Sequence, residues 1–171
     1  MTIRFRGCVE DDDFAQVSLY MVEHRRDLHP SLCTIDMVTI LYGYMSDGHL
    51  HYGVDEDGRI VGASGFYIQP SEEGVRDRAS VLIDVGIVDK ERRGTRLFLR
   101  GMRHMIDYVS DHYPEVEVVR LCALSDNPYL CKLYAKIAPF EGTREGSVGQ
   151  ESMFSGEIHR IRYILNRLNP L

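Results

Sequence analysis

The sequence predicts a mixed α/β fold, with a mostly antiparallel twisted sheet of about seven strands flanked by about four helices. Segments with strand-like apolar patterns outnumber segments whose apolar residues recur at helical spacing. Two strand-like segments, residues 79–88 and 116–123, are separated by a helical segment, and such a unit normally forms a parallel crossover. We therefore expect one parallel pair of strands in an otherwise antiparallel sheet.

The N-terminal part predicts a strand followed by two helices. Residues 3–9 alternate apolar and polar side chains, as a half-buried strand does. Three aspartates follow at positions 11–13, where carboxylates cap free N–H groups and favour the positive end of a helix dipole. The first helix should end near residue 29, and a second should begin with Thr34 as its N-cap and end at Gly48. The inward face of the second helix is expected to hold Met37, Val38, Leu41, Tyr42 and Met45.

A hairpin is the next predicted feature. The turn-forming residues Glu56-Asp57-Gly58 join two strand-like segments, residues 49–54 and 59–69. Gly62 and Gly65 lie inside the second of these segments. A glycine within a strand marks a bulge or a close approach of neighbouring backbone, and we expect one of the two here.

The centre of the chain predicts two buried strands with a helix between them. Residues 79–88 are almost continuously apolar, which is typical of a strand buried on both faces, and Asp84 is the only charged member. Residues 116–123 have the same character. The helix between them, residues 95–112, carries its inward positions at Phe98, Met102, Met105, Ile106 and Val109.

The C-terminal part predicts a short helix and two more strands. Asn127 or Asp126 caps the helix, and Pro128 lies in its first turn. Residues 140–148 and 157–165 are interpreted as strands, the second because apolar and polar side chains alternate along it. Residues 149–156 between them are interpreted as a loop.

Length and composition favour a single domain, residues 1–171. We expect a cytoplasmic protein that is either a monomer or a homodimer. The net charge of −6 argues against a nucleic-acid partner, because binding phosphates requires a basic face. No segment has the pattern of a targeting peptide or a membrane span. The four cysteines are scattered without a paired spacing, so we expect reduced thiols and no metal site.

An arginine–glycine turn, Arg93-Gly94, connects the central strand to the helix that follows it. Such a turn directs backbone N–H groups and the positive end of the helix dipole to one point, which suits a phosphate group. Arg96 and Arg100 add positive charge nearby on an acidic protein. The turn alone predicts an anion site of modest specificity.

Residues 88–98 resemble the cofactor signature of the GNAT family of acyl-CoA-dependent N-acyltransferases. The family pattern is typically Val-x-Pro-x-x-Arg-Gly-x-Gly, and this chain keeps Val88, Arg93 and Gly94 at that spacing. Arg96 and Phe98 stand where the family has small residues, which let a pyrophosphate approach the backbone. The order of predicted elements also matches the family's three-layer fold, in which the two parallel strands splay apart.

A second family signature resembles the segment after the next strand. Family members often carry Asn-x-x-Ala-x-x-x-Tyr-x-Lys-x-Gly-Phe. The matching residues here are Asn127, Leu133, Tyr134, Lys136 and Phe140, with Ala138-Pro139 as a one-residue expansion of the glycine turn. Because a helix and a strand of suitable length separate the two signatures, the resemblance is specific.

The resemblance implies that acetyl-CoA is a co-substrate and that an amine-bearing molecule is the acceptor. The main chain of Gly86, Ile87 and Val88 would bind the pantetheine arm and offer an N–H group to the oxyanion. The pyrophosphate would be held by Arg93, Gly94, Thr95, Arg96, Leu97 and Phe98. The side chain of Asn127 would also bind the pantetheine.

Tyr134 is the general acid that the resemblance implies, because a phenol is protonated at neutral pH and can protonate a departing thiolate. The general base stays open. Asp84 is one candidate, since burial raises the pKa of a carboxyl group towards a useful value. Glu73, Asp77 or an ordered water are the others.

The acceptor site is expected, again by resemblance, around the first helix and the segment 149–156. On the first helix the candidate residues are Tyr20, Glu23 and His24. These positions do not identify the acceptor. The leading hypothesis is therefore an N-acetyltransferase for a primary amine. A non-catalytic acyl-CoA-binding domain and a structural domain without CoA are the alternatives, because Arg96 and Phe98 depart from the signature.

Overall fold

The computed structural model describes residues 2–71 and 78–168. The chain forms two compact units, one of residues Met1–Tyr67 and Val85–Gly101 and the other of Ile68–Asp84 and Met102–Leu171. The strands are β1 (Arg4–Gly7), β2 (His49–Val54), β3 (Ile60–Gln69), β4 (Ser80–Val88), β5 (Val118–Leu124), β6 (Phe140–Glu145) and β7 (Gln150–Glu157). The helices are α1 (Asp11–Glu23), α2 (Arg25–Leu28), α3 (Thr34–Asp47), α4 (Leu97–His112), α5 (Pro128–Ala135) and α6 (Ile158–Leu168), with a short 3₁₀ turn at Lys90–Arg92.

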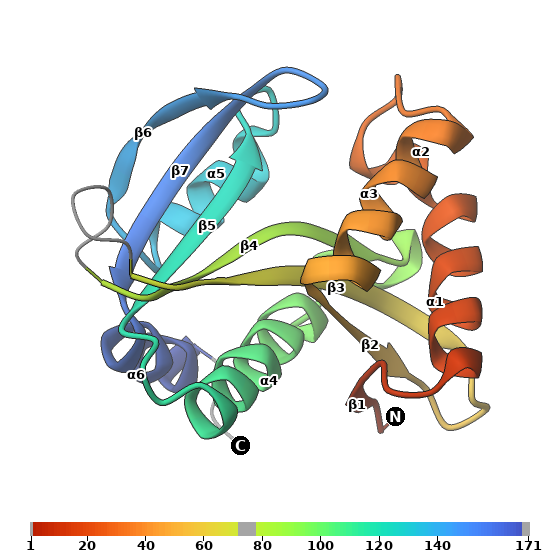
Figure 1. Cartoon of the computed structure of the whole chain (residues 1–171), viewed down its shortest axis with the longest axis horizontal. Coiled ribbons are helices and arrows are strands. Elements are labelled where there is room, and N and C mark those ends of the chain that lie inside the picture. The colour runs from red at the N-terminus through yellow and green to blue at the C-terminus, as the bar shows by residue number, and fades with distance from the viewer. Residues whose placement is uncertain (1, 72–77, 169–171) are drawn as a thin grey trace. The chain divides into compact units, whose positions relative to one another are not determined.

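The predicted mixed α/β fold is confirmed (Figure 1). The strands form one seven-stranded sheet in the order β1-β2-β3-β4-β5-β7-β6, with β4 and β5 parallel. The described residues hold six α-helices instead of about four. The two additional helices arise because the first predicted helix is divided into α1 and α2, and because the last predicted strand is the helix α6.

In the first unit, α1 and α3 pack against each other and cover the antiparallel strands β1 and β2 (Figure 1). Buried residues of α1, α3 and β2 form its main core, which includes Val17, Met21, Met37, Leu41, Tyr44, Leu50 and Tyr52. The three aspartates form the first turn of α1, where the sequence predicted a helix start, and the Asp13 carboxylate accepts hydrogen bonds from the backbone N–H groups of Val9 and Glu10. These two hydrogen bonds belong to a capping box at the N-terminus of α1.

The inward face predicted for α3 is only partly correct. Met37 and Leu41 are buried, but Val38, Tyr42 and Met45 are exposed, and Tyr44 is buried in their place. The reason is a glycine on the neighbouring strand. A Cβ atom on Gly65 would lie 2.4 Å from the ring of Tyr44, so the ring occupies space that only a glycine leaves open. The residue predicted as the N-cap, Thr34, is the first helical residue, and Cys33 is the cap.

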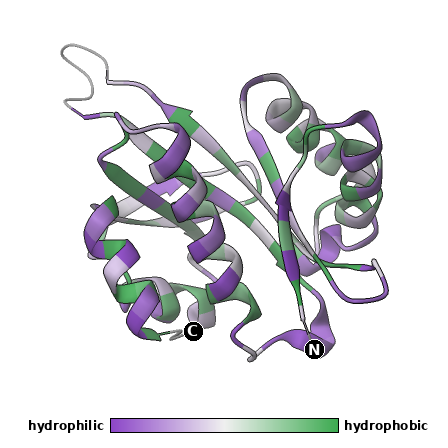
Figure 2. Ribbon diagram, turned by 90° about the horizontal axis from the view of Figure 1, so that it is seen from below, coloured by the Kyte–Doolittle hydropathy of each residue, from purple (hydrophilic) through white to green (hydrophobic). Residues whose placement is uncertain are grey.

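In the second unit, β4 pairs with β5 in parallel over Ser80–Ile83 and Val118–Leu121, and β7 pairs with β5 and β6 in antiparallel fashion. The helices α5 and α6 both contact β5 and β7. Figure 2 shows apolar and polar residues alternating around the helices, as expected where one helix face lies on a core.

Two predictions for the C-terminal part are wrong. Residues 150–157, interpreted mostly as a loop, form β7, which is stabilised by pairing with a strand on each side. Most of the segment interpreted as the last strand is α6. Its apolar residues Ile158, Ile161 and Leu165 recur at spacings of three and four residues, which is the period of a helix, and Ile161 and Leu165 are fully buried. No helix in the described ranges is both long and apolar enough to cross a bilayer.

Candidate functional site

The end of β4 is held against β3 within the first unit. The hydroxyl group of Ser64 donates a hydrogen bond to the Val85 carbonyl at 2.6 Å, and the N–H group of Asp89 donates to the Val61 carbonyl. A Cβ atom on Gly62 would lie 3.1 Å from the carbonyl oxygen of Ile87, so the predicted close approach at this glycine is confirmed. The predicted pantetheine-binding residues of β4 therefore lie on a firmly supported strand.

The turn between β4 and α4 is an open loop that depends on Gly94. This residue has φ of 78°, and nothing lies within 4 Å of the position of a Cβ atom. The hydroxyl of Thr95 donates to the Arg92 carbonyl at 2.6 Å and accepts the N–H of Leu97 at 3.2 Å. Thr95 therefore caps the first turn of α4, and the space beside Gly94 stays clear.

The predicted phosphate-binding arginine, Arg93, is held by two contacts in the first unit. Its Nε donates to the Val88 carbonyl at 3.2 Å, and its Nη2 lies 3.4 Å from the Asp27 carboxylate on α2. Lys90 pairs with the same carboxylate at 3.2 Å. Asp27 is thus an internal anion that two cations of the turn share. Arg96 is exposed.

Phe98, which replaces a small residue of the signature, packs towards β4. A Cβ atom placed on Gly86 would meet the Phe98 ring at 3.4 Å. The large side chain on α4 is therefore matched by a residue without a side chain on β4.

The remaining predicted site residues, Asp84, Asn127 and Tyr134, belong to the second unit. The Oδ1 atom of Asn127 accepts the N–H of Leu130 at 3.1 Å, so Asn127 rather than Asp126 caps α5. Tyr134 is 3% exposed and packs edge-on against the Phe154 ring. Burial raises the pKa of its phenol, and the negative charge of Asp84 is among the causes that raise it further. The hydroxyl is therefore protonated at neutral pH.

Two further residues of the second unit, Arg144 and Cys122, have pKa values that are shifted by their surroundings. Burial lowers the pKa of the Arg144 guanidinium group, but its hydrogen bond to Glu151 at 2.6 Å and the nearby negative charges, Asp84 among them, raise that pKa above its ordinary value. Burial, mainly, raises the pKa of the Cys122 thiol to about 12, so this cysteine is no nucleophile at neutral pH. The alternative bases Glu73 and Asp77 lie outside the described residues.

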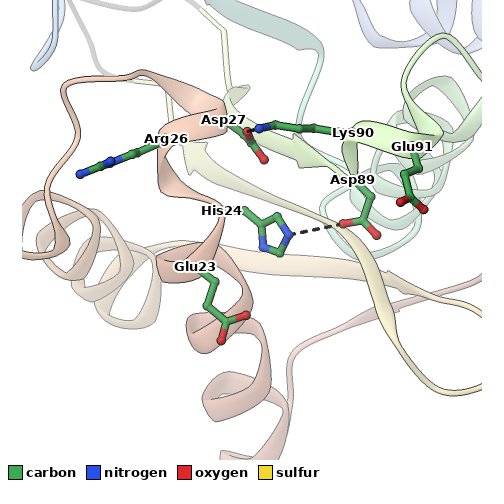
Figure 3. Close-up of a pocket in the computed structure, with 7 residues that line it drawn as sticks. All are labelled: Glu23, His24, Arg26, Asp27, Asp89, Lys90 and Glu91. Atoms are coloured by element: carbon green, nitrogen blue, oxygen red, sulfur yellow. Dashed lines mark ion pairs between the residues drawn. The ribbon is translucent and has the colours of Figure 1, made fainter.

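A polar pocket of about 460 Å³ lies in the first unit where α1, α2 and the end of β4 meet (Figure 3). Its lining residues are Glu23, His24, Arg26, Asp27, Asp89, Lys90 and Glu91. The sequence analysis predicted Glu23 and His24 for the acceptor site, but it did not predict that α2 and Asp89-Lys90-Glu91 would lie beside them. A signal was present, because polar residues directly after a buried strand commonly carry function.

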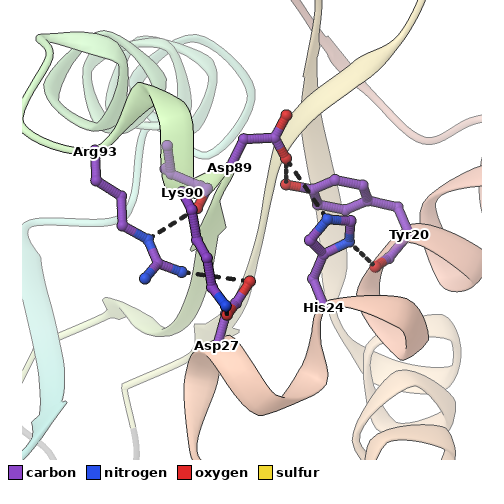
Figure 4. A network of polar contacts seen from close by, with 7 residues as sticks. Tyr20, His24, Asp27, Asp89, Lys90 and Arg93 are labelled. Carbon is purple, nitrogen blue, oxygen red and sulfur yellow. Dashed lines mark hydrogen bonds and ion pairs between the residues drawn. The ribbon is translucent and has the colours of Figure 1, made fainter.

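A hydrogen-bonded network forms one wall of this pocket (Figure 4). The hydroxyl of Tyr20 donates to the Asp89 carboxylate at 2.7 Å, and the His24 ring stacks on the Tyr20 ring at 4.2 Å. Burial and then the bond to Asp89 raise the pKa of Tyr20, so this phenol stays protonated and holds the carboxylate in place. Tyr20 is thus a positioning residue within the predicted acceptor region.

The comparison with protein families decides the identity of the fold. A family model described as the acetyltransferase (GNAT) family matches residues 18–138, which is more than half of the chain. The chain belongs to the GNAT acetyltransferase family. The match includes the Arg93-Gly94 turn and α5 with Tyr134. No curated protein sequence matches this GNAT chain.

Solved structures agree with this GNAT fold. The GNAT-family acetyltransferase of Streptococcus pneumoniae aligns with a TM-score of 0.63 at 15% identity, covering 91% of this chain and 99% of that chain. NAA60 of Arabidopsis thaliana in complex with acetyl-CoA aligns with a TM-score of 0.64 at 17% identity, covering 92% and 99%. Aminoglycoside acetyltransferase AAC(6')-Ib in complex with coenzyme A and kanamycin reaches 0.70 at 14% identity, covering 95% and 98%.

Proposed function

We propose that this protein transfers an acetyl group from acetyl-CoA to a primary amine of a small molecule or protein, by direct attack in a ternary complex. The observation that carries the proposal is the family match over residues 18–138, which contains the first signature segment and all but the last two residues of the second. Two of the similar structures contain acetyl-CoA or coenzyme A, which supports the choice of co-substrate.

The turn after β4 has the features that an acyl-CoA pyrophosphate requires. Gly94 leaves open space beside the backbone, and the adjoining α4 presents its positive end. Arg96 is exposed and available to a phosphate, and Arg93 is close by. The residues that would hold the co-substrate are Gly86, Ile87 and Val88 for the pantetheine arm, with Asn127, and Arg93, Gly94, Thr95, Arg96, Leu97 and Phe98 for the pyrophosphate.

Tyr134 would supply the proton for the leaving thiolate. Its burial keeps the phenol protonated at neutral pH, which is the form a general acid needs. Asp84 influences this phenol through its charge and is a candidate for the base. An N–H group at the end of β4 would stabilise the oxyanion of the tetrahedral adduct.

A second candidate function is non-catalytic acyl-CoA binding. The specific observation that favours it is that Arg93 is already bound to the Asp27 carboxylate and to the Val88 carbonyl. A phosphate must compete with these contacts. Arg96 and Phe98 also favour this second candidate, because they replace the small residues that let a pyrophosphate approach the backbone.

The decisive experiment measures thiol release from acetyl-CoA with a panel of primary amines, for the wild-type protein and for Tyr134→Phe. We expect transfer by the wild type and a loss of about 100-fold in kcat for Tyr134→Phe, because general acid catalysis is removed. Tyr129→Phe on the same helix is the matched control, since Tyr129 is 66% exposed, and it should retain its rate.

Two results would contradict parts of the proposal. A Tyr134→Phe protein with full kcat would remove Tyr134 from the reaction. Tight binding of acetyl-CoA without transfer to any amine would favour the non-catalytic function.

A further inference from the structure

We propose that Asp27 is an internal counter-ion of the turn after β4, that acetyl-CoA displaces it, and that Lys90 then binds phosphate together with Arg93. This inference rests on the proposed binding of acetyl-CoA. It adds two residues, Asp27 and Lys90, to which the family signature gives no role. The observations that carry it are the two ion pairs of Asp27, the separate anchor of Arg93 and the sparse packing of α2.

The Asp27 carboxylate binds one cation with each of its oxygen atoms. Its Oδ1 atom lies 3.2 Å from Nζ of Lys90, and its Oδ2 atom lies 3.4 Å from Nη2 of Arg93. Figure 4 shows both cationic side chains directed from the turn at this one carboxylate. Ammonium and guanidinium groups both bind phosphate oxygens, which carry the same kind of negative charge as a carboxylate. A phosphate and Asp27 are therefore competitors for the same two cations.

Arg93 can change its anionic partner without moving. Its Nε atom donates to the Val88 carbonyl at 3.2 Å, a contact that does not involve Asp27. Because the guanidinium group is planar and rigid, fixing Nε also fixes the direction of Nη2. Arg93 directly precedes Gly94, where the turn is open. An anion bound at this turn thus competes with Asp27 for a donor that is already in position.

Lys90 adds a cation that the family signature lacks. It stands where the pattern Val-x-Pro-x-x-Arg has proline, because it follows Val88 by two residues and precedes Arg93 by three. Its side chain is 73% exposed, whereas that of Asp27 is only 12% exposed. A lysine on a flexible and exposed stem can follow an incoming anion. The extra cation offsets part of the repulsion that an acidic protein exerts on acetyl-CoA.

The helix that carries Asp27 is sparsely packed. α2 has four residues, and none of them is buried, although Leu28 packs partly against the core of the first unit. The ion pairs of Asp27 therefore provide much of the attachment of α2 to the turn. Loss of both pairs should leave α2 less protected, since segments with few buried contacts open most easily.

The first test measures the dissociation constant of acetyl-CoA by isothermal titration calorimetry, without any amine. Ion pairs of partly exposed side chains are weak, so Asp27→Asn should bind acetyl-CoA about fivefold more tightly than the wild type. Asp27→Glu keeps the negative charge and should bind like the wild type. Asp12→Asn is the matched control, because it makes the same change in net charge at an exposed position of α1 and should also bind like the wild type.

S-acetylpantetheine shows whether the phosphates are responsible. It contains the thioester arm and no phosphate, so the wild type and Asp27→Asn should bind it equally. Equal tightening for this molecule and for acetyl-CoA would overturn the inference. Unchanged or weaker binding of acetyl-CoA by Asp27→Asn, with an unchanged melting temperature, would overturn it as well. If the melting temperature falls, the behaviour of Asp27→Glu decides, since tightening in that variant too would exclude a role of the charge.

A double-mutant cycle tests Lys90. In the wild type, Lys90 exchanges one anion for another when acetyl-CoA binds, whereas in Asp27→Asn it gains an anion. Lys90→Gln should therefore weaken binding about twofold in the wild type and about fivefold in the Asp27→Asn background. Arg26→Gln removes an exposed cation of α2 and should have equal effects in both backgrounds. Equal effects of Lys90→Gln would remove Lys90 from the phosphate site.

Hydrogen exchange tests the displacement itself. Acetyl-CoA should accelerate amide exchange in residues 25–28 of the wild type, although a bound ligand usually slows exchange near its site. Slower exchange there would show that Asp27 stays in place. If no amine is acetylated, the proposed function fails, and these binding measurements still decide the role of Asp27. Binding by Asp27→Asn alone would support that role, and absence of binding in both proteins would refute it.

Discussion

At the scale of single residues, the position of the buried Tyr44 ring depends on two glycines beside it. A Cβ atom on Gly65 would lie 2.4 Å from the Tyr44 ring, and one on Gly48 would lie 2.9 Å from it. Tyr44 also stacks on Tyr67, with ring centroids 4.8 Å apart, and is 1% exposed. The ring is therefore buried in close contact with both glycines, and a larger residue at position 65 must displace it.

We expect Gly65→Ala to lower the free energy of unfolding by about 1–3 kcal/mol, because the extra methyl group overpacks the core. Urea unfolding monitored by circular dichroism measures the change. Gly86→Ala is the matched control for stability, since its Cβ atom would only reach ordinary contact with Phe98 at 3.4 Å. Equal stability of the Gly65→Ala and wild-type proteins would show that Tyr44 is not confined in this way.

At the scale of elements, Asp13 joins α1 to the sheet. Its carboxylate accepts hydrogen bonds from two backbone N–H groups ahead of α1 and from the Tyr52 hydroxyl on β2 at 2.7 Å. The bond to Tyr52 and then those to Val9 and Glu10 hold the pKa of this carboxyl below its ordinary value of 3.8. The ionised form is thus the one that stabilises the fold.

We expect Asp13→Ala to lower stability at neutral pH by about 1 kcal/mol, as for the loss of a helix cap. The contribution of Asp13 is complete above the ordinary carboxyl pKa and is lost as pH falls through the lowered pKa of the folded state. The difference between wild type and variant should therefore shrink in acid. Thermal unfolding over a pH series measures it. Asp11→Ala is the control, because Asp11 is exposed, and a difference that persists in strong acid would contradict the explanation.

At the scale of the whole molecule, an acidic protein is proposed to bind an acidic co-substrate. The net charge is −6, so the arginines of the turn after β4 must outweigh a general repulsion. Such binding depends on local charge and is weakened by salt.

We expect acetyl-CoA at a hundredfold excess over Kd to add about 2.7 kcal/mol to the free energy of unfolding. For a chain of this length that corresponds to a rise in melting temperature of roughly 5–10 °C. Differential scanning fluorimetry measures the shift, which should fall in Arg96→Ala and stay unchanged in Arg160→Ala, an exposed arginine of α6. The absence of any shift in the wild type would instead favour a structural domain that has lost CoA.

Much of the fold was predictable because local patterns and tertiary structure agree. The strands around Glu56-Asp57-Gly58, the buried character of β4 and the helix after it follow from hydrophobic pattern and turn chemistry alone. The α6 segment shows where this fails. Ile161, Tyr163 and Leu165 alternate as in a strand, whereas Ile158, Ile161 and Leu165 recur at helical spacing, and the burial of Ile161 and Leu165 with Tyr163 exposed agrees with the helix.

The candidate site divides in the same way. The residue types and spacing of Arg93-Gly94 and of Asn127 to Tyr134 were enough to indicate the family. The pairing of Arg93 with Asp27 could not be predicted, because the two residues are far apart in sequence and no local rule relates them.

The mixed fold, the family and the chemical types of the proposed reacting groups were predictable before the structure was known, since these depend on pattern and spacing along the chain. Three features became apparent only in the folded protein: the buried face of α3, the helix over residues 158–168, and the network of His24, Asp89 and Tyr20. The physical reason is that burial and ion pairing depend on neighbours that are distant in sequence, and folding alone brings them together.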